Sequence, residues 1–269
     1  LGTSIPAAQA AFIRYVLGLV LLLPILRIVW RTALTKELWT LFAARGFCHC
    51  IGVALWFYAM ARIPIADITA MNYLSPVFVT LGATLFLGET LAFRRIMAII
   101  AALLGALIIL RPGFSEIGSG HLAMLGVAFL FAGSYLLAKR VSDMVAPSLV
   151  VFMLSIFVTI GLAPIAWLVW IPLSSTDMAL LFVVAALATL GHYTMTLALA
   201  AAPISVTQPV TFLQLVWAVL LGAAVFAEPI DIWVVSGGLI IIFAISFISW
   251  REAYLERSHL TPPSPATKV

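Results

Sequence analysis

Long apolar runs recur along this chain, and short polar connections separate them. A run of about 18 to 25 apolar residues crosses the roughly 30 Å hydrocarbon core of a bilayer as a helix, which satisfies its own backbone hydrogen bonds. Charged residues make up only 9% of the 269 residues, against roughly 25% in soluble domains. The sequence lacks the alternating segments of about ten residues that build a transmembrane β-barrel. This pattern predicts a polytopic, all-α integral membrane protein.

The apolar runs predict nine transmembrane helices. Gly, Pro, Ser and Asp gather in the connections, as in "RPGFSEIGSG" at 111–120, and such residues are typical of turns. The polar, proline-rich end at 254–269 predicts a disordered cytoplasmic tail. The predicted helices span residues 5–27, 38–61, 65–87, 94–111, 121–139, 147–171, 178–200, 204–226 and 232–250.

Basic residues concentrate in alternate connections and predict the orientation. On one side lie Arg27, Arg31, Lys36, Arg94, Arg95, Lys139, Arg140, Arg251, Arg257 and Lys268. The other side holds only Arg62 and Arg111 among the basic residues assigned to a side. Because Lys and Arg favour the cytoplasmic side of a membrane, the first set and the C-terminus are predicted to be cytoplasmic.

An internal repeat relates the two halves of the chain. A shift of 139 places "ARIPIADITAMNYLSPVFVTLGATLFLGE" at 61–89 on "AAAPISVTQPVTFLQLVWAVLLGAAVFAE" at 200–228 without a gap. The predicted halves, 1–114 and 115–253, have opposite orientation in the membrane. Inverted repeats mark secondary transporters, whose substrate sites lie near the midplane between the halves. The helix predicted at 121–139 has no counterpart within the chain, so we expect five helices per half in the complete fold, with the first helix missing here.

The chain resembles the drug/metabolite transporter superfamily, specifically the EamA-type permeases. The resemblance rests on "PAAQAAFIRYVLGLVLLLP" at 6–24, "LWFYAMARIPIADITAMNYLSPVFVTLGATLFLGE" at 55–89, "GALIILRPG" at 105–113 and "PVTFLQLVWAVLLGAAVFAE" at 209–228. It implies a ten-helix secondary carrier of small metabolites such as amino acids, vitamins or drugs, in a bacterial inner membrane. It also implies that both termini are cytoplasmic.

The stretch "RGFCHC" at 45–50 concentrates chemistry in a predicted helix. Cys48 and Cys50 diverge by about 200° around a helix, so they cannot chelate one metal ion, and no metal is expected. Arg45 and His49 instead share one helix face with Trp56. A buried arginine costs roughly 2.5–3.5 kcal/mol on insertion scales, so Arg45 either faces a polar cavity or extends to the membrane surface. His49 either lines that cavity or makes an ordinary bond between helices.

Polar residues form matching stripes on two helices related by the repeat. One stripe includes Asn72 and Tyr73, and its counterpart includes Gln208, Thr211, Gln214 and Trp217. Such side chains either join helices or line a pathway, and the matched pair favours a pathway, which His192 could help to close.

Three charged residues are instead predicted to be structural. Arg14 lies inside its helix, and Glu89 and Glu228 lie at matched helix ends.

These observations predict a secondary transporter and no enzymatic activity. An intramembrane enzyme would need paired catalytic acids or an HExxH motif, and the repeat argues against a channel or scaffold. The phosphate-binding loop GxxxxGK[ST] is absent from the sequence, and no cofactor is expected. A cavity with Arg45, His49, Trp56, Tyr58 and Tyr73 would suit a planar or aromatic solute that bears a carboxylate. The expected partners are a small-molecule substrate and the lipid bilayer, not nucleic acid, and a homo-oligomer is compatible with the sequence.

Overall fold

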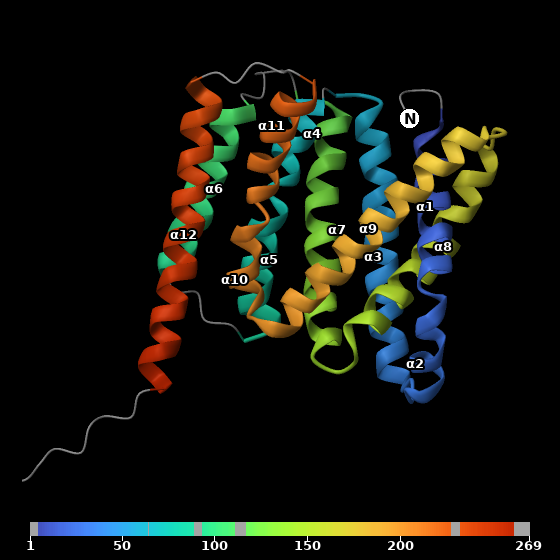
Figure 1. The fold of residues 1–269 in the computed structure, drawn as a ribbon, viewed down its shortest axis with the longest axis horizontal. Coiled ribbons are helices and arrows are strands. Elements are labelled where there is room, and N and C mark those ends of the chain that lie inside the picture. Colours follow the sequence, from blue (N-terminus) through green and yellow to red (C-terminus); the bar gives the residue numbers. More distant parts are fainter. Residues whose placement is uncertain (1–4, 64, 89–92, 111–116, 227–231, 261–269) are drawn as a thin grey trace, which may run out of the picture.

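The computed structural model describes residues 5–63, 65–88, 93–110, 117–226 and 232–260, and every regular element in them is a helix (Figure 1). Four of these helices are long and apolar enough to cross a membrane: α3 (Lys36–Met60), α7 (Ser119–Ser142), α8 (Pro147–Leu168) and α9 (Ser175–Ala201). A bent pair at the N-terminal end makes a fifth candidate span. The prediction of an all-helical membrane protein is confirmed.

Local sequence signals set the ends of these spans. The Thr35 side chain accepts a hydrogen bond from the Leu38 amide and caps α3. Ser174 and Asp177 form a reciprocal capping box at the start of α9. Pro147 begins α8, where its missing N–H has no helical partner to lose.

The predicted helix at 5–27 is not one straight helix, so that prediction is wrong. The chain forms α1 (Ala7–Leu21), a short 3-10 turn η1 (Leu23–Ile25) and α2 (Leu26–Arg31), with a bend of 51° at the break. Pro24 lies in the turn and has no amide hydrogen to continue the α-helical ladder. The bend is therefore a local consequence of proline.

The predictions of single helices at 65–87 and 204–226 are also wrong, because both segments break near the middle. The first forms α4 (Ile65–Asn72) and α5 (Ser75–Phe86), and the second forms α10 (Ile204–Val210) and α11 (Leu213–Phe226). Pro76 cannot donate to the carbonyl four residues earlier, which favours the first break. The break residues Tyr73 and Phe212 are 139 positions apart, so the interruptions coincide in the repeat.

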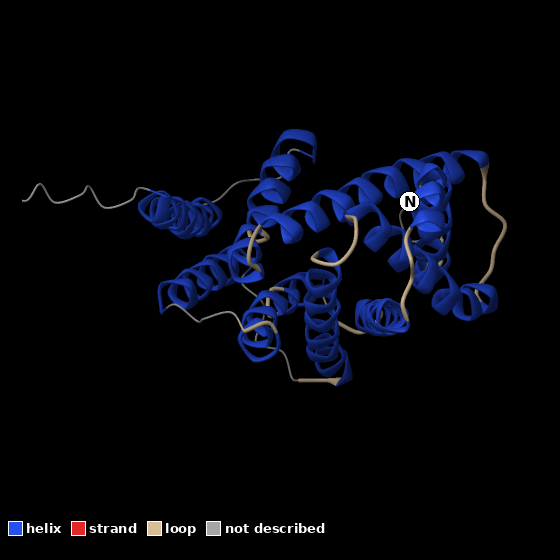
Figure 2. Cartoon of the chain, turned by 90° about the horizontal axis from the view of Figure 1, so that it is seen from below, coloured by secondary structure: helices blue, strands red, loops and turns tan. Residues whose placement is uncertain are grey.

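Helices related by the repeat also pack against each other. The helices α6 (Phe93–Leu110) and α12 (Ile232–Leu260) lie side by side in Figure 1, and α1 packs on α8. Seen from below in Figure 2, the helices form a single elongated bundle. A Cβ on Gly105 would lie 2.8 Å from the Gly237 carbonyl oxygen. Small residues thus let α6 and α12 approach closely, as in other membrane helix pairs.

One amide side chain joins α1 to the connection between α8 and α9. The Gln9 side chain donates to the Ile171 carbonyl at 2.8 Å and accepts from the Ile171 amide at 3.0 Å. Gln9 is fully buried. Both polar groups of its amide are therefore satisfied where water is excluded.

Ionisable side chains form pairs near both ends of the bundle. At the lower end in Figure 1, where α7 turns into α8, Lys139 donates to Asp143 and to the Leu199 carbonyl, and Arg140 lies 3.9 Å from Glu37. Near the opposite end, the buried Asp67 of α4 lies 3.6 Å from His121 of α7.

Candidate functional site

Arg45 is buried in the middle of the bundle and does not extend to the surface. Its side chain is 2% exposed, and its Nη1 donates to the Val150 carbonyl of α8 at 2.9 Å. Its buried Nε has no hydrogen-bond partner. A buried donor left without an acceptor costs about 1–3 kcal/mol, more when it is charged. The guanidinium is therefore held by one helix and retains the capacity to bind another acceptor.

His49 lies one turn along α3 and joins three helices. Its Nε2 is 2.8 Å from the Tyr15 hydroxyl of α1, and its Nδ1 is 3.5 Å from the Ser134 hydroxyl of α7. The ring stacks on Phe131 at a centroid distance of 5.0 Å. Contacts on both nitrogens and on one face fix the position of this imidazole.

A second imidazole and a second guanidinium complete the group. His192 of α9 meets the His49 ring edge-to-face at 5.8 Å, and Arg14 lies over the Tyr15 ring at 4.1 Å. We call Arg14, Tyr15, Arg45, His49, Ser134 and His192 the polar cluster. It draws side chains from α1, α3, α7 and α9.

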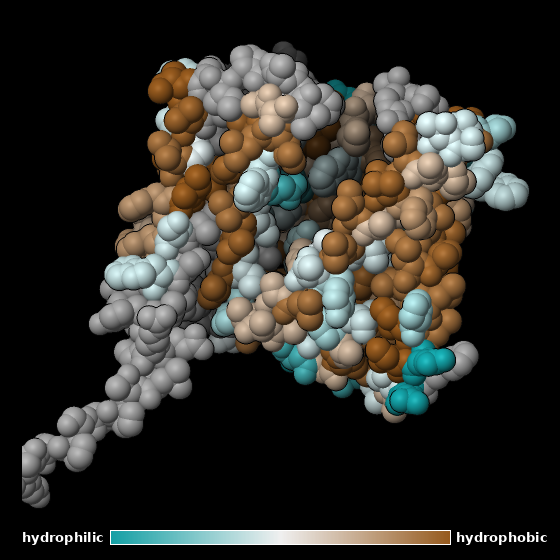
Figure 3. Space-filling view, viewed as in Figure 1, coloured by the Kyte–Doolittle hydropathy of each residue, from teal (hydrophilic) through white to brown (hydrophobic). Residues whose placement is uncertain are grey.

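A small pocket lies between α9 and α10. It has a volume of about 280 Å³, and its lining includes Gly191, Thr194 and Thr211. Gly191 directly precedes His192, and Thr211 lies at the break between α10 and α11. Figure 3 shows that the molecular surface is also hollowed between α11 and α9. The pocket therefore adjoins the second helix break, and one of its lining residues is next to His192 in sequence.

The predicted stripe residues on α4 and α5 lie at the first break. The Tyr73 ring stacks on Phe212 with centroids 4.9 Å apart. The buried side-chain oxygen of Asn72 has no hydrogen-bond partner. Trp56 is partly buried and packs on Phe131, which also contacts His49. The sequence-predicted residues therefore form two groups, one on α3 and one at the helix breaks.

Other predicted residues lie apart from these groups. Gln214 is exposed, and Trp217 is 63% exposed on α11. Tyr58 donates to Ser119 and lies under Arg62 at 3.5 Å, where α3 ends. The Gln208 side chain, Glu89 and Glu228 are outside the described residues, so their predicted roles are untested.

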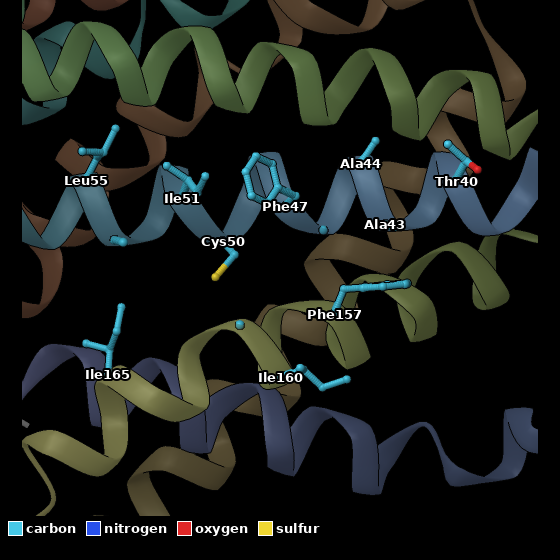
Figure 4. A pocket seen from close by; sticks show the side chains of 13 residues that line it. Thr40, Ala43, Ala44, Phe47, Cys50, Ile51, Leu55, Phe157, Ile160 and Ile165 are labelled. Carbon is cyan, nitrogen blue, oxygen red and sulfur yellow. The ribbon is translucent and has the colours of Figure 1, made fainter.

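The two cysteines point to different neighbours. Cys48 lies toward Gly133 of α7, whereas Cys50 lies toward Gly161 of α8. Figure 4 shows the Cys50 sulfur in an apolar groove of about 890 Å³ between α3 and α8. Within the described ranges, no three His, Cys, Asp or Glu side chains come together as a metal site.

Carboxylates in the described part of the chain lie away from the polar cluster. Asp67 contacts His121, Glu37 and Asp143 are more than half exposed, and Asp177 caps α9. The cluster therefore combines positive charge with neutral donors and acceptors, which suits a ligand with oxygen or nitrogen acceptors.

Sequence reasoning missed Tyr15, Phe131 and Ser134. Tyr15 directly follows Arg14, so its place beside a charged residue was a usable signal. Ser134 and Phe131 lie in a helix whose predicted partner was unknown. Their role depends on which face of α7 meets α3, and periodicity within one helix cannot determine that contact.

Long apolar helices that enclose a polar cluster and a small pocket, with helices broken beside them, define a multi-pass membrane transporter. The EamA-like transporter family model matches residues 1–111 and 118–250, so the chain belongs to that family and is a transporter, not an enzyme.

The relatives differ in what they carry. The riboflavin transporter of Vibrio cholerae is 30% identical over 94% of this chain and 86% of its own length. The riboflavin transporter of Rhizobium johnstonii is 32% identical over 94% of this chain and 84% of its own length. The S-adenosylmethionine uptake transporter of Rickettsia prowazekii is 25% identical over 94% of this chain and 86% of its own length. A solved crystal structure shares the fold, with a TM-score of 0.77 and 16% identity over 92% of this chain and 90% of that one.

Proposed function

We propose that the protein is a secondary transporter whose substrate site comprises the polar cluster and the pocket between α9 and α10, with riboflavin as the first candidate substrate. The observation that carries this proposal is the membrane-buried Arg45, which keeps an unpaired donor beside His49 and His192. A charge held inside a bilayer protein marks a functional position in most cases. The riboflavin transporters among the relatives supply the candidate.

The proposed architecture has two inverted repeats, 1–114 and 115–253, in a bacterial inner membrane. The packing of α1 on α8 and of α6 on α12 supports it, since each pair joins helices related by the repeat. The end with Lys139 and Arg140 would be cytoplasmic. A helix before α1 would cover α9 as α7 covers α3.

The chemistry of the cluster favours a flavin over a cation. The isoalloxazine ring of riboflavin is planar and presents carbonyl and ring-nitrogen acceptors, which arginine and imidazole can bind. S-adenosylmethionine carries a sulfonium cation. Two guanidiniums without a described carboxylate beside them repel such a charge. We therefore rank riboflavin before S-adenosylmethionine.

Transport by purified protein in liposomes tests this proposal. Radiolabelled riboflavin should exchange across the membrane, and unlabelled riboflavin should compete while S-adenosylmethionine should not. The matched control is Arg62→Ala, which removes an exposed arginine outside the cluster. If riboflavin neither exchanges nor competes with another carried solute, this substrate assignment fails.

A further inference from the structure

The stack of Tyr73 on Phe212 joins two residues that the repeat makes equivalent. They are 139 positions apart, the same shift that aligns 61–89 with 200–228. Their rings are nearly parallel, with an interplanar angle of 18°. Both are buried, at 6% and 0% exposure. Each residue occupies the break in its own helix, so two matched interruptions meet face to face.

A residue can touch its own repeat counterpart only where the axis that relates the repeats passes between them, as in a symmetric dimer. A second equivalent pair lies in the same buried cluster, because Ala102 of α6 and Ile241 of α12 are also 139 positions apart. Two independent pairs therefore place the axis through this cluster.

Contacts away from the axis are not matched in this way. At the lower end, α5 packs on α10, where Ala83 and Ile204 share a buried cluster. The equivalent upper contact would join α11 to α4. In the described residues it is far less extensive than the lower one, and Figure 3 shows the hollow beside α11. The two repeats therefore have different conformations around a common axis.

We propose that Tyr73 and Phe212 form the pivot of the transport cycle, a contact that persists while the two ends open in turn. This inference rests on the proposed alternating-access function. When inverted repeats exchange conformations, a contact at the lower end is replaced by its counterpart at the upper end. A contact on the axis is its own counterpart, so the exchange leaves it in place. The breaks beside it let each half-helix tilt around the stacked rings.

Cross-linking tests the pivot in a cysteine-free background, Cys48→Ser with Cys50→Ser. One variant adds Tyr73→Cys and Phe212→Cys, and a matched control adds Ala83→Cys and Ile204→Cys at the lower end. Each protein is linked with a short bis-methanethiosulfonate reagent, and its riboflavin exchange is compared with that of the same protein after reduction. The pivot link should change the rate less than about twofold, while the lower link should reduce it more than tenfold.

Loss of exchange in the linked Tyr73–Phe212 protein, restored by reduction, would overturn the pivot and identify a moving gate. Absence of riboflavin exchange in the cysteine-free protein that retains Tyr73 and Phe212 would instead count against the proposed function. Hydrogen exchange of α5 and α10 amides then supplies the readout, because it needs no substrate. The link between residues 83 and 204 should suppress hydrogen exchange of the α5 and α10 amides. Equal suppression by the Tyr73–Phe212 link would also overturn the pivot.

Discussion

The helices α3 and α9 match each other in the proposed repeat. They differ in their polar side chains and in how far neighbouring helices bury them. The α9 residues that match Arg45 and His49 are Val184 and Ala188. In the most apolar stretch of each helix, 33% of the residues are buried in α3 but only 11% in α9. The two segments matched by the proposed repeat therefore differ in these side chains and in their burial. Of these two helices, α3 carries the Arg45 charge and α9 has Val184 at the matching position. A substrate between them would therefore meet one charged and one apolar surface.

The largest expected effect comes from removing that charge. Arg45→Ala should reduce transport roughly ten- to a hundredfold, because a hydrogen bond to a charged group contributes about 1.5–3 kcal/mol. Arg45→Lys should recover only part of the rate, since an ammonium lacks the planar fork of a guanidinium. Initial rates in liposomes, with protein amounts matched, measure both. Full activity in Arg45→Ala would mean that the arginine only anchors α3 to α8.

A matched pair of glycines tests whether α3 is more closely packed by its neighbours than α9. Gly52 of α3 and Gly191 of α9 are equivalent in the repeat, but a Cβ on Gly52 would lie 2.5 Å from the Phe131 ring, whereas nothing lies within 4 Å of one on Gly191. Gly52→Ala should destabilise the protein by about 1–3 kcal/mol through overpacking. In a protein with only the helices described here, Gly191→Ala should have almost no effect. Thermal unfolding in detergent measures both.

Equal destabilisation by the two alanines would show that α9 is covered, for example by a further helix. That result would support the proposed helix before α1. The helices α3 and α9 would then differ in their side chains and no longer in their burial.

The hydrogen bond between His49 and Tyr15 should have a smaller effect. Tyr15→Phe removes the hydroxyl and should slow transport about threefold to tenfold, since one neutral hydrogen bond contributes about 0.5–1.5 kcal/mol. His49→Gln should retain more activity than His49→Ala because an amide still bonds. If Tyr15→Phe transports as fast as the unchanged protein, the bond does not contribute to the site.

The smallest effect is expected from the cysteines. Cys48→Ser with Cys50→Ser should leave transport within about twofold, because the two thiols face α7 and α8 separately and only small shifts in packing are expected. Rates before and after a thiol-blocking reagent provide the measurement. A large loss would assign the thiols a role that their separate surroundings do not indicate.

The placement of most apolar segments could be predicted because hydrophobic length is a local property. The face shared by Arg45 and His49 was equally readable from helical spacing, and both side chains are buried together. The breaks were not predicted as interruptions, although Pro76 and the repeat were visible. Whether a proline bends or divides a membrane helix depends on neighbouring helices that satisfy the freed backbone groups.

The contacts of Ser134 and His192 with His49 also required the tertiary structure. They join helices that lie 85 and 143 positions away in sequence. A polar side chain on α7 or α9 has several possible partners, and the packing of helices selects among them. The chemistry of the site was therefore visible on α3, and His192 was a candidate, but its contact with His49 and the place of Ser134 were not predicted.

The amide clamp between Gln9 and Ile171 bears on the route that a solute can take. Separating α1 from the connection between α8 and α9 would break both hydrogen bonds of the Gln9 amide, which contribute about 0.5–1.5 kcal/mol each. At the upper value, this seam would open in fewer than about one molecule in a hundred at equilibrium. We expect it to stay closed in most molecules, which directs solute passage to the side of the bundle where α9 faces α10 and α11.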